Sequence, residues 1–398
     1  MLPTLASHNS DIRRLIEKGY ALAYDSTHYL IARDMPYLDS AGSLQVGAFV
    51  TKLEFIDQQH VKQHDHTILF AGGVPHGLDG QPVPNLGGGL STLVLAKESA
   101  DVVVQRSFSN KPRTTGAYND FFDKIESYAN QICAPAREKH GAEWLTFKVR
   151  QEEIPSESVF KIHDTLSSLA EIGDLSGRFR NDVIAIIGLG GTGSYVLDFI
   201  AKTPVREIRA FDHDTFHVHN AFRSPGQLDP ESEFGRAKAD IYRSRYDSFR
   251  HGLKINQQFV DAGSVADFDG VTFAFVCVDK GESRAGIFRL LLEKGIPFID
   301  VGIGLKRKDG PLKGTVRTTY YSVEHGAIVR DKGYAELSTA PDDLYRLNIQ
   351  TAELNATNAA FAVMRFKQLR GFYLEEMPFH HAVFYPHNFK TIGEHELP

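Results

Sequence analysis

The sequence predicts an α/β protein in which a smaller α+β domain precedes a doubly wound, Rossmann-type, mostly parallel sheet. Beyond residue 181, short and continuously apolar runs alternate with helix-like segments, a pattern typical of parallel strands covered on both faces. The first of these runs leads directly into a Gly-x-Gly-x-x-Gly turn, which joins a strand to a helix in such folds. Alternating apolar segments before residue 150 predict the smaller domain.

Composition and charge narrow the class of protein. The 398 residues leave room for two or three domains, and 42% hydrophobic with 24% charged residues is an ordinary globular balance. The 44 Lys and Arg against 50 Asp and Glu give a net charge of −6, so no basic footprint for nucleic acid is present. We therefore expect no nucleic-acid partner.

Cysteine content and apolar runs predict the compartment. Cys133 and Cys277 cannot build a disulfide framework, and the N-terminus lacks the pattern of a signal peptide. The longest apolar stretches, such as VTFAFVCV, fall far below the roughly 18 residues that a membrane span requires. We expect a cytoplasmic protein with no membrane partner.

Residues 1–150 alternate in the manner of strands and end in a helix-like run, YNDFFDKIESYANQI. The predicted strands are HYLIAR, VGAFVTKLEF, HTILFAG, STLVLAKE and VVVQRSF. Residues 151–180 form the predicted connector, because an apolar stripe at helical spacing leads into the polar break DLSGRFRND. The stripe consists of Val159, Ile162, Leu166, Leu169 and Ile172.

Residues 181–398 form the predicted main domain. Its strands are VIAIIGLG, IRAFDHD, KINQQFV, VTFAFVCVD and PFIDVG, with helices after the first strand and around 235–247 and 283–294. Beyond Gly304 we expect a strand at TVRTTYYS, a long helix from about Asp343 to Phe372, and short strands at AVFYP and FKTI.

The glycine turn is the first candidate for a binding site. Gly188, Gly190 and Gly193 lie between a buried strand and a helix, where backbone N–H groups and the helix dipole hold phosphate. Asp212 ends the next strand, where an acidic side chain binds a ribose hydroxyl in dinucleotide-binding folds. These features predict a nucleotide but leave ATP and NAD unseparated.

Charged residues further along the chain favour ATP. Arg223 and Lys238 follow the second strand, as does Asn220, and such cations suit a triphosphate that is about to lose pyrophosphate. Asp279 ends another strand at the same edge, and a carboxylate beside phosphates needs a bridging ion such as Mg²⁺. Asp279 therefore predicts magnesium.

Four segments carry a specific resemblance: IIGLGGTGSYV, FDHDTFHVHNAFRSPG, FGRAKAD and VCVDKGESR. In this order they resemble the ThiF/MoeB family of ubiquitin-activating-type enzymes, over roughly residues 158–395. The resemblance implies ATP- and Mg²⁺-dependent adenylation of the C-terminal carboxylate of a ubiquitin-like protein, with release of pyrophosphate. It also implies a homodimer, in which Arg178 or Arg180 would reach the partner's ATP.

The resemblance assigns roles residue by residue. Asp212 would bind the ribose with support from Asp214, and Asp279 would hold Mg²⁺. The phosphates and the transition state would be bound by the glycine turn, including Gly191, and by Asn220, Arg223 and Lys238. The resemblance also implies a supporting role at the site for Arg284.

The chain departs from the family in its cysteines. Two isolated cysteines cannot supply the four ligands of the structural zinc site that many relatives have, so we expect no zinc. No cysteine follows Cys277, where ubiquitin-activating enzymes form a thioester, so the chemistry stops at the adenylate or passes to a partner. The layout also resembles a bacterial subfamily whose N-terminal domain of unknown function is similar to conjugating enzymes, although His76 and no cysteine lies in the corresponding segment.

Alternative functions remain open at this point. One is an NAD-dependent oxidoreductase, which Lys238 and Asp279 argue against, and the other is an inactive scaffold that binds a ubiquitin-like protein. Cys277 lies in an apolar strand and is expected to be inert. The histidines His60, His64, His66 and His76 match no standard metal spacing.

Overall fold

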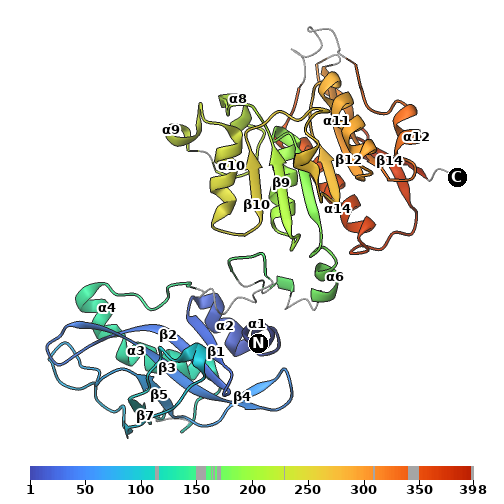
Figure 1. The fold of residues 1–398 in the computed structure, drawn as a ribbon. Helices are drawn as coiled ribbons and strands as arrows, with labels where there is room; N and C mark the ends of the chain where they lie inside the picture. Colours follow the sequence, from blue (N-terminus) through green and yellow to red (C-terminus); the bar gives the residue numbers. More distant parts are fainter. Residues whose placement is uncertain are drawn as a thin grey trace. The chain divides into compact units, whose positions relative to one another are not determined.

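The chain consists of two compact units, Met1–Ile172 and Gly173–Pro398, in a computed structural model (Figure 1). The structure describes residues 1–112, 116–148, 158–162, 164, 166–167, 172–227, 229–307, 310–338 and 349–395.

The first unit is an antiparallel sheet with helices before and after it in the sequence. The helices are α1 (Leu2–His8), α2 (Ser10–Lys18), α3 (Phe121–Ile132) and α4 (Ala134–His140), with a 3₁₀ turn, η1 (Lys97–Ser99). The strands are β1 (Ala21–Asp25), β2 (Tyr29–Leu38), β3 (Leu44–Phe55), β4 (Val61–Gln63), β5 (Ile68–Ala71), β6 (Gly89–Leu90) and β7 (Arg106–Phe108). Their order is β1-β2-β3-β5-β7-β6, with β4 paired to β3.

Apolar side chains cover both faces of this sheet. Helices α2 and α3 bury Leu15 and Ile125 against Phe49 on one face. On the other face, the segment after β6 packs Leu93 and Leu95 against the sheet. The prediction of a strand at STLVLAKE is therefore wrong, because its alternating leucines pack as a loop across the sheet and form no strand.

The second unit contains an eight-stranded sheet. Its strands are β8 (Val183–Ile187), β9 (Glu207–Phe211), β10 (Leu253–Asn256), β11 (Phe273–Val276), β12 (Phe298–Arg307), β13 (Leu312–Tyr321), β14 (Phe379–Tyr385) and β15 (Lys390–His395). The order is β10-β9-β8-β11-β12-β13-β14-β15. The first five strands are parallel and the last three antiparallel, which confirms a mostly parallel sheet.

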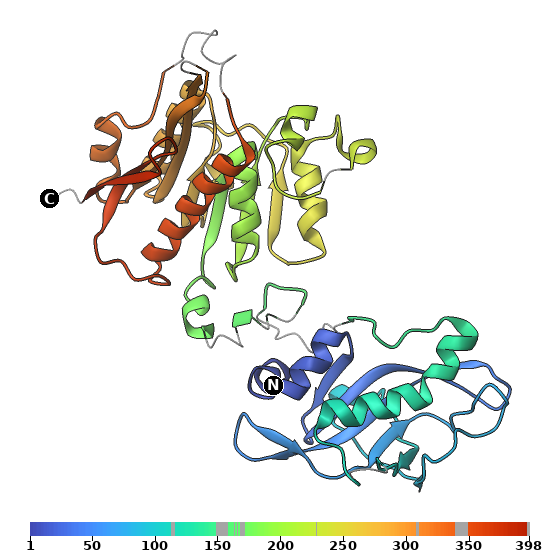
Figure 2. The same ribbon diagram turned by 180° about the vertical axis from the view of Figure 1, so that it is seen from behind.

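Helices cover both faces of the second sheet, as the doubly wound prediction requires. They are α6 (Gly173–Gly177), α7 (Gly191–Ala201), α8 (Val218–Ala221), α9 (Pro230–Glu233), α10 (Lys238–Asp247), α11 (Gly281–Glu293), α12 (Gly326–Asp331) and α14 (Ala352–Leu369), with the 3₁₀ turn η3 (Ala266–Phe268). Ile184 and Ile186 of β8 pack with α7, α10 and α14 (Figure 2), whereas Val183, Ala185 and Ile187 pack with α11 on the opposite face (Figure 1).

Two predicted helices differ from the structure. Ser158–Ile162, where the connector stripe begins, is not helical, because Phe160 turns inward and is buried there. Leu166 and Ser167 are helical as predicted, whereas Leu169 lies outside the described residues. The long helix begins at Ala352, since Thr351 has extended backbone, and residues 343–348 of the prediction lie outside the described chain. Among the described helices, none has the length and apolarity needed to cross a membrane.

Candidate functional site

The candidate site lies where β8 and β11 end. These neighbouring strands are parallel, and the chain leaves them toward opposite sides of the sheet, β8 to β9 and β11 to β12. Such a reversal of strand order leaves a crevice at the carboxyl edge, which is where doubly wound folds bind ligands. Gly188 ends β8 with φ +90°, and a Cβ there would lie 2.9 Å from the Cys277 carbonyl oxygen. Only glycine allows the two loops to approach so closely.

The glycine turn is closely packed on two sides and open at one residue. A Cβ on Gly193 would overlap the carbonyl oxygen of Gly188, and a Cβ on Gly191 would overlap the side-chain amide of Asn355. Nothing lies within 4 Å of a Cβ built on Gly190, the N-cap of α7. The first N–H groups of a helix have no intrahelical partner. The turn therefore offers donors and space to a phosphate.

Asp212 holds the glycine turn from the end of β9. Its Oδ2 atom accepts a hydrogen bond from the Leu189 backbone N–H at 2.6 Å, and its Oδ1 atom accepts one from Asp214 N–H at 2.8 Å. Lys238 at the start of α10 is buried, with Nζ 2.9 Å from Asp214 Oδ2 and 3.6 Å from Asp212 Oδ1. The structure thus brings three predicted site residues together.

The charges around Asp214 place further cations beside this group. Burial acts to raise the pKa of Asp214, but the hydrogen bond and charge of Lys238, with the charges of His213 and Lys280, hold it below its usual range. Burial, Arg223 and Lys238 lower the pKa of His219. Lys238 and Lys280 thus contribute positive charge near Asp214, and Arg223 and Lys238 contribute it near His219.

Asn220 and Arg223 come from α8 and the residues after it. The Asn220 side chain is buried, and its Oδ1 atom accepts from the His217 backbone N–H at 2.8 Å, which closes the start of α8. Arg223 Nη1 donates to Gln350 Oε1 at 3.1 Å. The Arg223 guanidinium is thus directed by the segment that precedes α14.

Asp279 lies exposed in the loop between β11 and α11, directly before Lys280. Arg284 fixes this loop from below: its Nη2 donates to the Val278 carbonyl oxygen and its Nη1 to that of Glu336 at 3.0 Å. Its Nε atom pairs with Asp300 at 3.0 Å, and both side chains are buried. Arg284 is therefore a buried structural residue behind the site.

No cluster of three metal-ligating side chains includes Asp279 among the residues that the structure describes. Within the described residues, one group has three metal-ligating side chains in range, Asp212, His213 and Asp214, with atoms within 4.8 Å of one another. Lys238 already pairs with both carboxylates, so its charge opposes a cation at that position. A magnesium ion bound through Asp279 would need phosphate oxygens as its other ligands.

The remaining candidates lie apart from the glycine turn. Cys133 is fully buried and Cys277 partly buried, and burial raises the pKa of both thiols. Arg178 donates to the Gly371 carbonyl oxygen of its own chain at 2.5 Å, and Arg180 is exposed. The four histidines have separate neighbours: His60 with Asp57, His64 with Glu54, His66 with Ser109 and His76 with the Val74 carbonyl.

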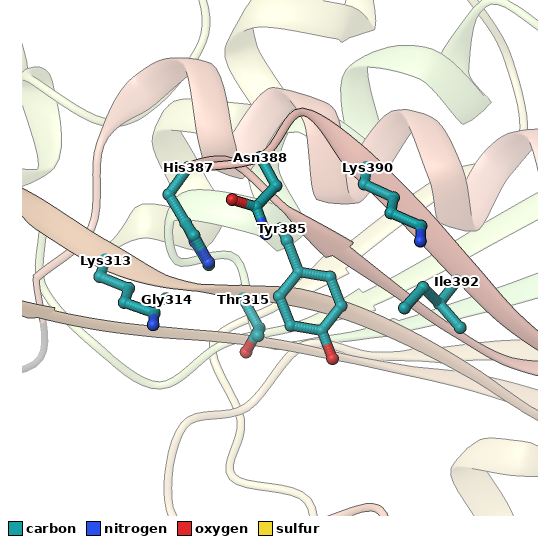
Figure 3. Close-up of a pocket in the computed structure, with 8 residues that line it drawn as sticks. All are labelled: Lys313, Gly314, Thr315, Tyr385, His387, Asn388, Lys390 and Ile392. Atoms are coloured by element: carbon teal, nitrogen blue, oxygen red, sulfur yellow. The ribbon is translucent and has the colours of Figure 1, made fainter.

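A pocket of about 300 Å³ opens on the antiparallel part of the sheet (Figure 3). It is lined by Lys313, Gly314, Thr315, Tyr385, His387, Asn388, Lys390 and Ile392. None of the predicted site residues lines it.

Lys280, Gln350 and Asn355 were not predicted from the sequence. Lys280 lies within the VCVDKGESR segment, next to the predicted Asp279, and could have been found there. Gln350 and Asn355 are more than 150 residues from the glycine turn, and no motif marks them.

Comparisons with known proteins find a family match for each part of the chain. Residues 166–342 match the ThiF family, and residues 10–165 match a domain of unknown function, DUF6791. Ubiquitin-like modifier-activating enzyme 5 of Dictyostelium discoideum is 24% identical over 161 residues, 35% of this chain and 41% of that protein. The tRNA threonylcarbamoyladenosine dehydratase of Escherichia coli K12 is 25% identical over 128 residues, which are 31% of this chain and 47% of that protein.

Among solved structures, E. coli MccB with ATP shows 14% identity and a TM-score of 0.40, covering 56% of this chain and 65% of that one. The tRNA N6-threonylcarbamoyladenosine dehydratase TcdA of E. coli, in complex with AMP, shows 18% identity and a TM-score of 0.39. The match covers 50% of this chain and 89% of that one. The chain spans less than half the length of the two curated relatives described above. Residues 166–342, most of which lie in the second unit, thus match the ThiF family, and the preceding residues 10–165 match DUF6791.

Proposed function

We propose that this chain catalyses ATP-dependent adenylation of the C-terminal carboxylate of a ubiquitin-like protein, with release of pyrophosphate. One observation carries the proposal: Asp212 accepts a hydrogen bond from the Leu189 N–H in the glycine turn and lies 3.6 Å from Lys238 Nζ, so positive charge lies beside the turn. A triphosphate that loses pyrophosphate needs this concentration of positive charge, whereas the diphosphate of NAD needs little.

The chemistry requires positioning and charge stabilisation. A C-terminal carboxylate with a pKa of roughly 3.5 is already ionised at neutral pH, so no general base is needed. One carboxylate oxygen would attack the α-phosphorus, and the bond from that phosphorus to the bridging oxygen would break as pyrophosphate leaves. Arg223 and Lys238 would stabilise the negative charge that develops on the leaving group. Lys238 would then exchange its bond to Asp214 for phosphate oxygens.

Magnesium fits the donor set at one residue. Asp279 is an exposed carboxylate at the carboxyl edge. The next residue, Lys280, helps to lower the pKa of Asp214. Mg²⁺ commonly binds through one or two carboxylates and phosphate oxygens, so Asp279 would hold the ion once nucleotide is present. The ion would neutralise phosphate charge there.

The class of substrate rests on the sequence and on the relatives. Two classes appear among their names: modifier-activating enzymes and tRNA dehydratases. The net charge of −6 argues against a tRNA partner, since polyanion binding depends on Lys and Arg contacts to phosphates. We propose a ubiquitin-like protein with a free C-terminus as the substrate. We further propose that the enzyme is a homodimer and that a conjugating enzyme is the next acceptor.

The decisive experiment is ATP–pyrophosphate exchange with candidate ubiquitin-like proteins. Exchange should require Mg²⁺ and a free C-terminal carboxylate, so the same protein with an amidated C-terminus is the matched control. Nucleotide binding measured with ATP and NAD separates the alternatives. Tighter binding of NAD would indicate an oxidoreductase, and ATP binding with no exchange for any substrate would indicate a scaffold.

A further inference from the structure

The start of α14 lies against the glycine turn through one buried side chain. Asn355 has no exposed surface, and its Oδ1 atom accepts a hydrogen bond from Thr192 Oγ1 at 2.9 Å. Its Nδ2 atom has no hydrogen-bond partner and occupies the place that a Cβ on Gly191 would take. Gly191 is thus a glycine that makes room for an amide.

The position of this amide relative to α7 follows from helix geometry. The Cα–Cβ bond of a helical residue tilts toward the N-terminus of its helix. An atom at the Cβ position of Gly191 therefore lies on the N-terminal side of α7, where the first N–H groups lack intrahelical partners. The unpaired N–H group of Asn355 lies on the same side as these donors.

Two further unpaired polar atoms belong to the segment before Asn355 and to Arg223, which this segment contacts. Arg223 Nε and Thr351 Oγ1 are shielded from solvent and have no hydrogen-bond partner. Gln350, which precedes Thr351, accepts from Arg223, and the Asn355 backbone N–H donates to the Thr351 carbonyl. Residues 350–355 thus connect Arg223 to the first turn of α7 through the hydrogen bonds of Gln350 and Asn355.

An unpaired buried donor is costly, so its presence calls for a reason. Such a group destabilises the folded protein, a cost that an apolar side chain of similar size would avoid. Asn358, one turn further along α14, provides an internal comparison. It is equally buried, yet Nδ2 donates to the Gly302 carbonyl at 3.3 Å and Oδ1 accepts from Thr318 Oγ1 at 3.4 Å. Of these two buried asparagines, only Asn355 has an Nδ2 atom without a hydrogen-bond partner.

We propose that Asn355 is a positioning residue of the phosphate-binding turn. It acts through α7: the bond to Thr192 fixes the first turn, and the unpaired N–H group directs the positive end of the amide dipole toward a bound phosphate. No direct contact with the nucleotide is required, which agrees with its burial. This inference rests on the proposed nucleotide function of the same turn.

The test compares ATP affinity, measured by calorimetry, for wild type, Asn355→Asp, Asn355→Ala and the matched control Asn358→Ala. Asn355→Asp keeps the acceptor for Thr192 but reverses the local charge, and we expect ATP affinity to fall by roughly tenfold or more, on the scale of one hydrogen bond to a charged group. Asn355→Ala should weaken ATP binding less, and Asn358→Ala should leave it unchanged. Thermal unfolding without nucleotide reports the structural cost of each change.

A pH series provides a readout that a structural role would not produce. Burial raises the pKa of a carboxyl group, so the group introduced in Asn355→Asp should become neutral as pH falls. Its deficit in ATP affinity relative to wild type should then shrink between about pH 8 and about pH 5.5. Should Asn355→Asp fail to fold, the comparison of Asn355→Ala with Asn358→Ala decides.

Wild-type affinity in both Asn355 variants, or an equal loss in Asn358→Ala, would overturn the inference. Wild-type protein that binds ATP but shows no pyrophosphate exchange contradicts the proposed function alone. Wild-type protein that binds no ATP contradicts both.

Discussion

At the scale of single residues, Asp279 offers the cleanest separation of chemistry from folding. Its side chain is exposed in a loop, so Asp279→Ala should leave the thermal unfolding midpoint nearly unchanged. If the carboxylate holds Mg²⁺ only when nucleotide is bound, the variant should lose Mg²⁺-dependent pyrophosphate exchange by roughly a hundredfold or more. Exchange at the wild-type rate would remove Asp279 from the site.

Arg223 tests the positive charge instead of the metal. Its guanidinium is directed by Gln350 and acts on His219 together with Lys238. Arg223→Ala should slow exchange by roughly one to several orders of magnitude, the usual scale for losing a charge clamp on a phosphoryl transition state. Gln350→Ala, which keeps the charge but releases its direction, should cause a smaller loss. Equal rates for wild type and Arg223→Ala would contradict the assignment.

Sequence alone reached some of these residues because local patterns mark them. Gly188 and Asp212 follow buried strands at a spacing that strand–turn–helix geometry imposes. Asn355 has no such mark, since a helix rich in small residues indicates close packing and says nothing about which residue meets the glycine turn. The pairing of Arg223 with Gln350 arises from the fold, and spacing cannot predict it.

At the scale of elements, Asp300 joins β12 to its neighbours. Its buried carboxylate accepts from Arg284 Nε at 3.0 Å and from Arg317 Nη2 at 2.5 Å. Asp300→Asn would leave two cations without their counter-charge, so the free energy of unfolding should fall by about 3–5 kcal/mol. Asp269→Asn removes an exposed carboxylate paired with Lys294 and should lower the free energy of unfolding far less. Chemical denaturation that gives equal values for both variants would contradict this account.

Strand β14 should make the second unit sensitive to acid. Burial and the nearby charge of Arg317 lower the pKa of His381 to about 4, and its ring stacks on Tyr334 at 3.9 Å. A lowered folded-state pKa means that the unfolded chain binds the proton more readily. The stabilisation is present above about pH 6.5 and is lost as pH falls toward about 4. Chemical denaturation between pH 7 and 4 should show a loss of up to a few kcal/mol, which His381→Gln should reduce.

Element types were predicted best where burial alone determines them. Strands β8 and β11 are fully buried runs, and covering helices dictate that pattern. Predictions failed where apolar residues pack without regular structure. Leu93 and Leu95 alternate as a strand would, but they cover a sheet whose hydrogen bonds are made by other segments. The pattern of apolar residues records burial, and burial does not require a strand.

At the scale of the whole molecule, the question is whether activation ends at the adenylate or continues on this chain. Cys133 and Cys277 are the two cysteines of the sequence, one in each unit. Cys133 lies at the end of α3 with no exposed surface, and burial raises the pKa of its thiol. Cys277 lies beneath the glycine turn, and burial raises its pKa as well. A thioester needs an accessible thiolate, which neither environment favours.

We therefore expect free adenylate as the product of the enzyme alone. Cys133→Ala, chosen over serine because a buried hydroxyl would need a partner, should support wild-type exchange and wild-type transfer to a conjugating enzyme supplied in trans. The measurement is a non-reducing gel after incubation with ATP, Mg²⁺ and the ubiquitin-like substrate, with Cys277→Ala run beside it. A covalent band that reductant removes, present in wild type and absent in one of the two variants, would contradict the expectation. It would also identify the acceptor, and a band that depends on Cys133 would show that the first unit opens during the reaction, since its thiol is buried as the unit stands.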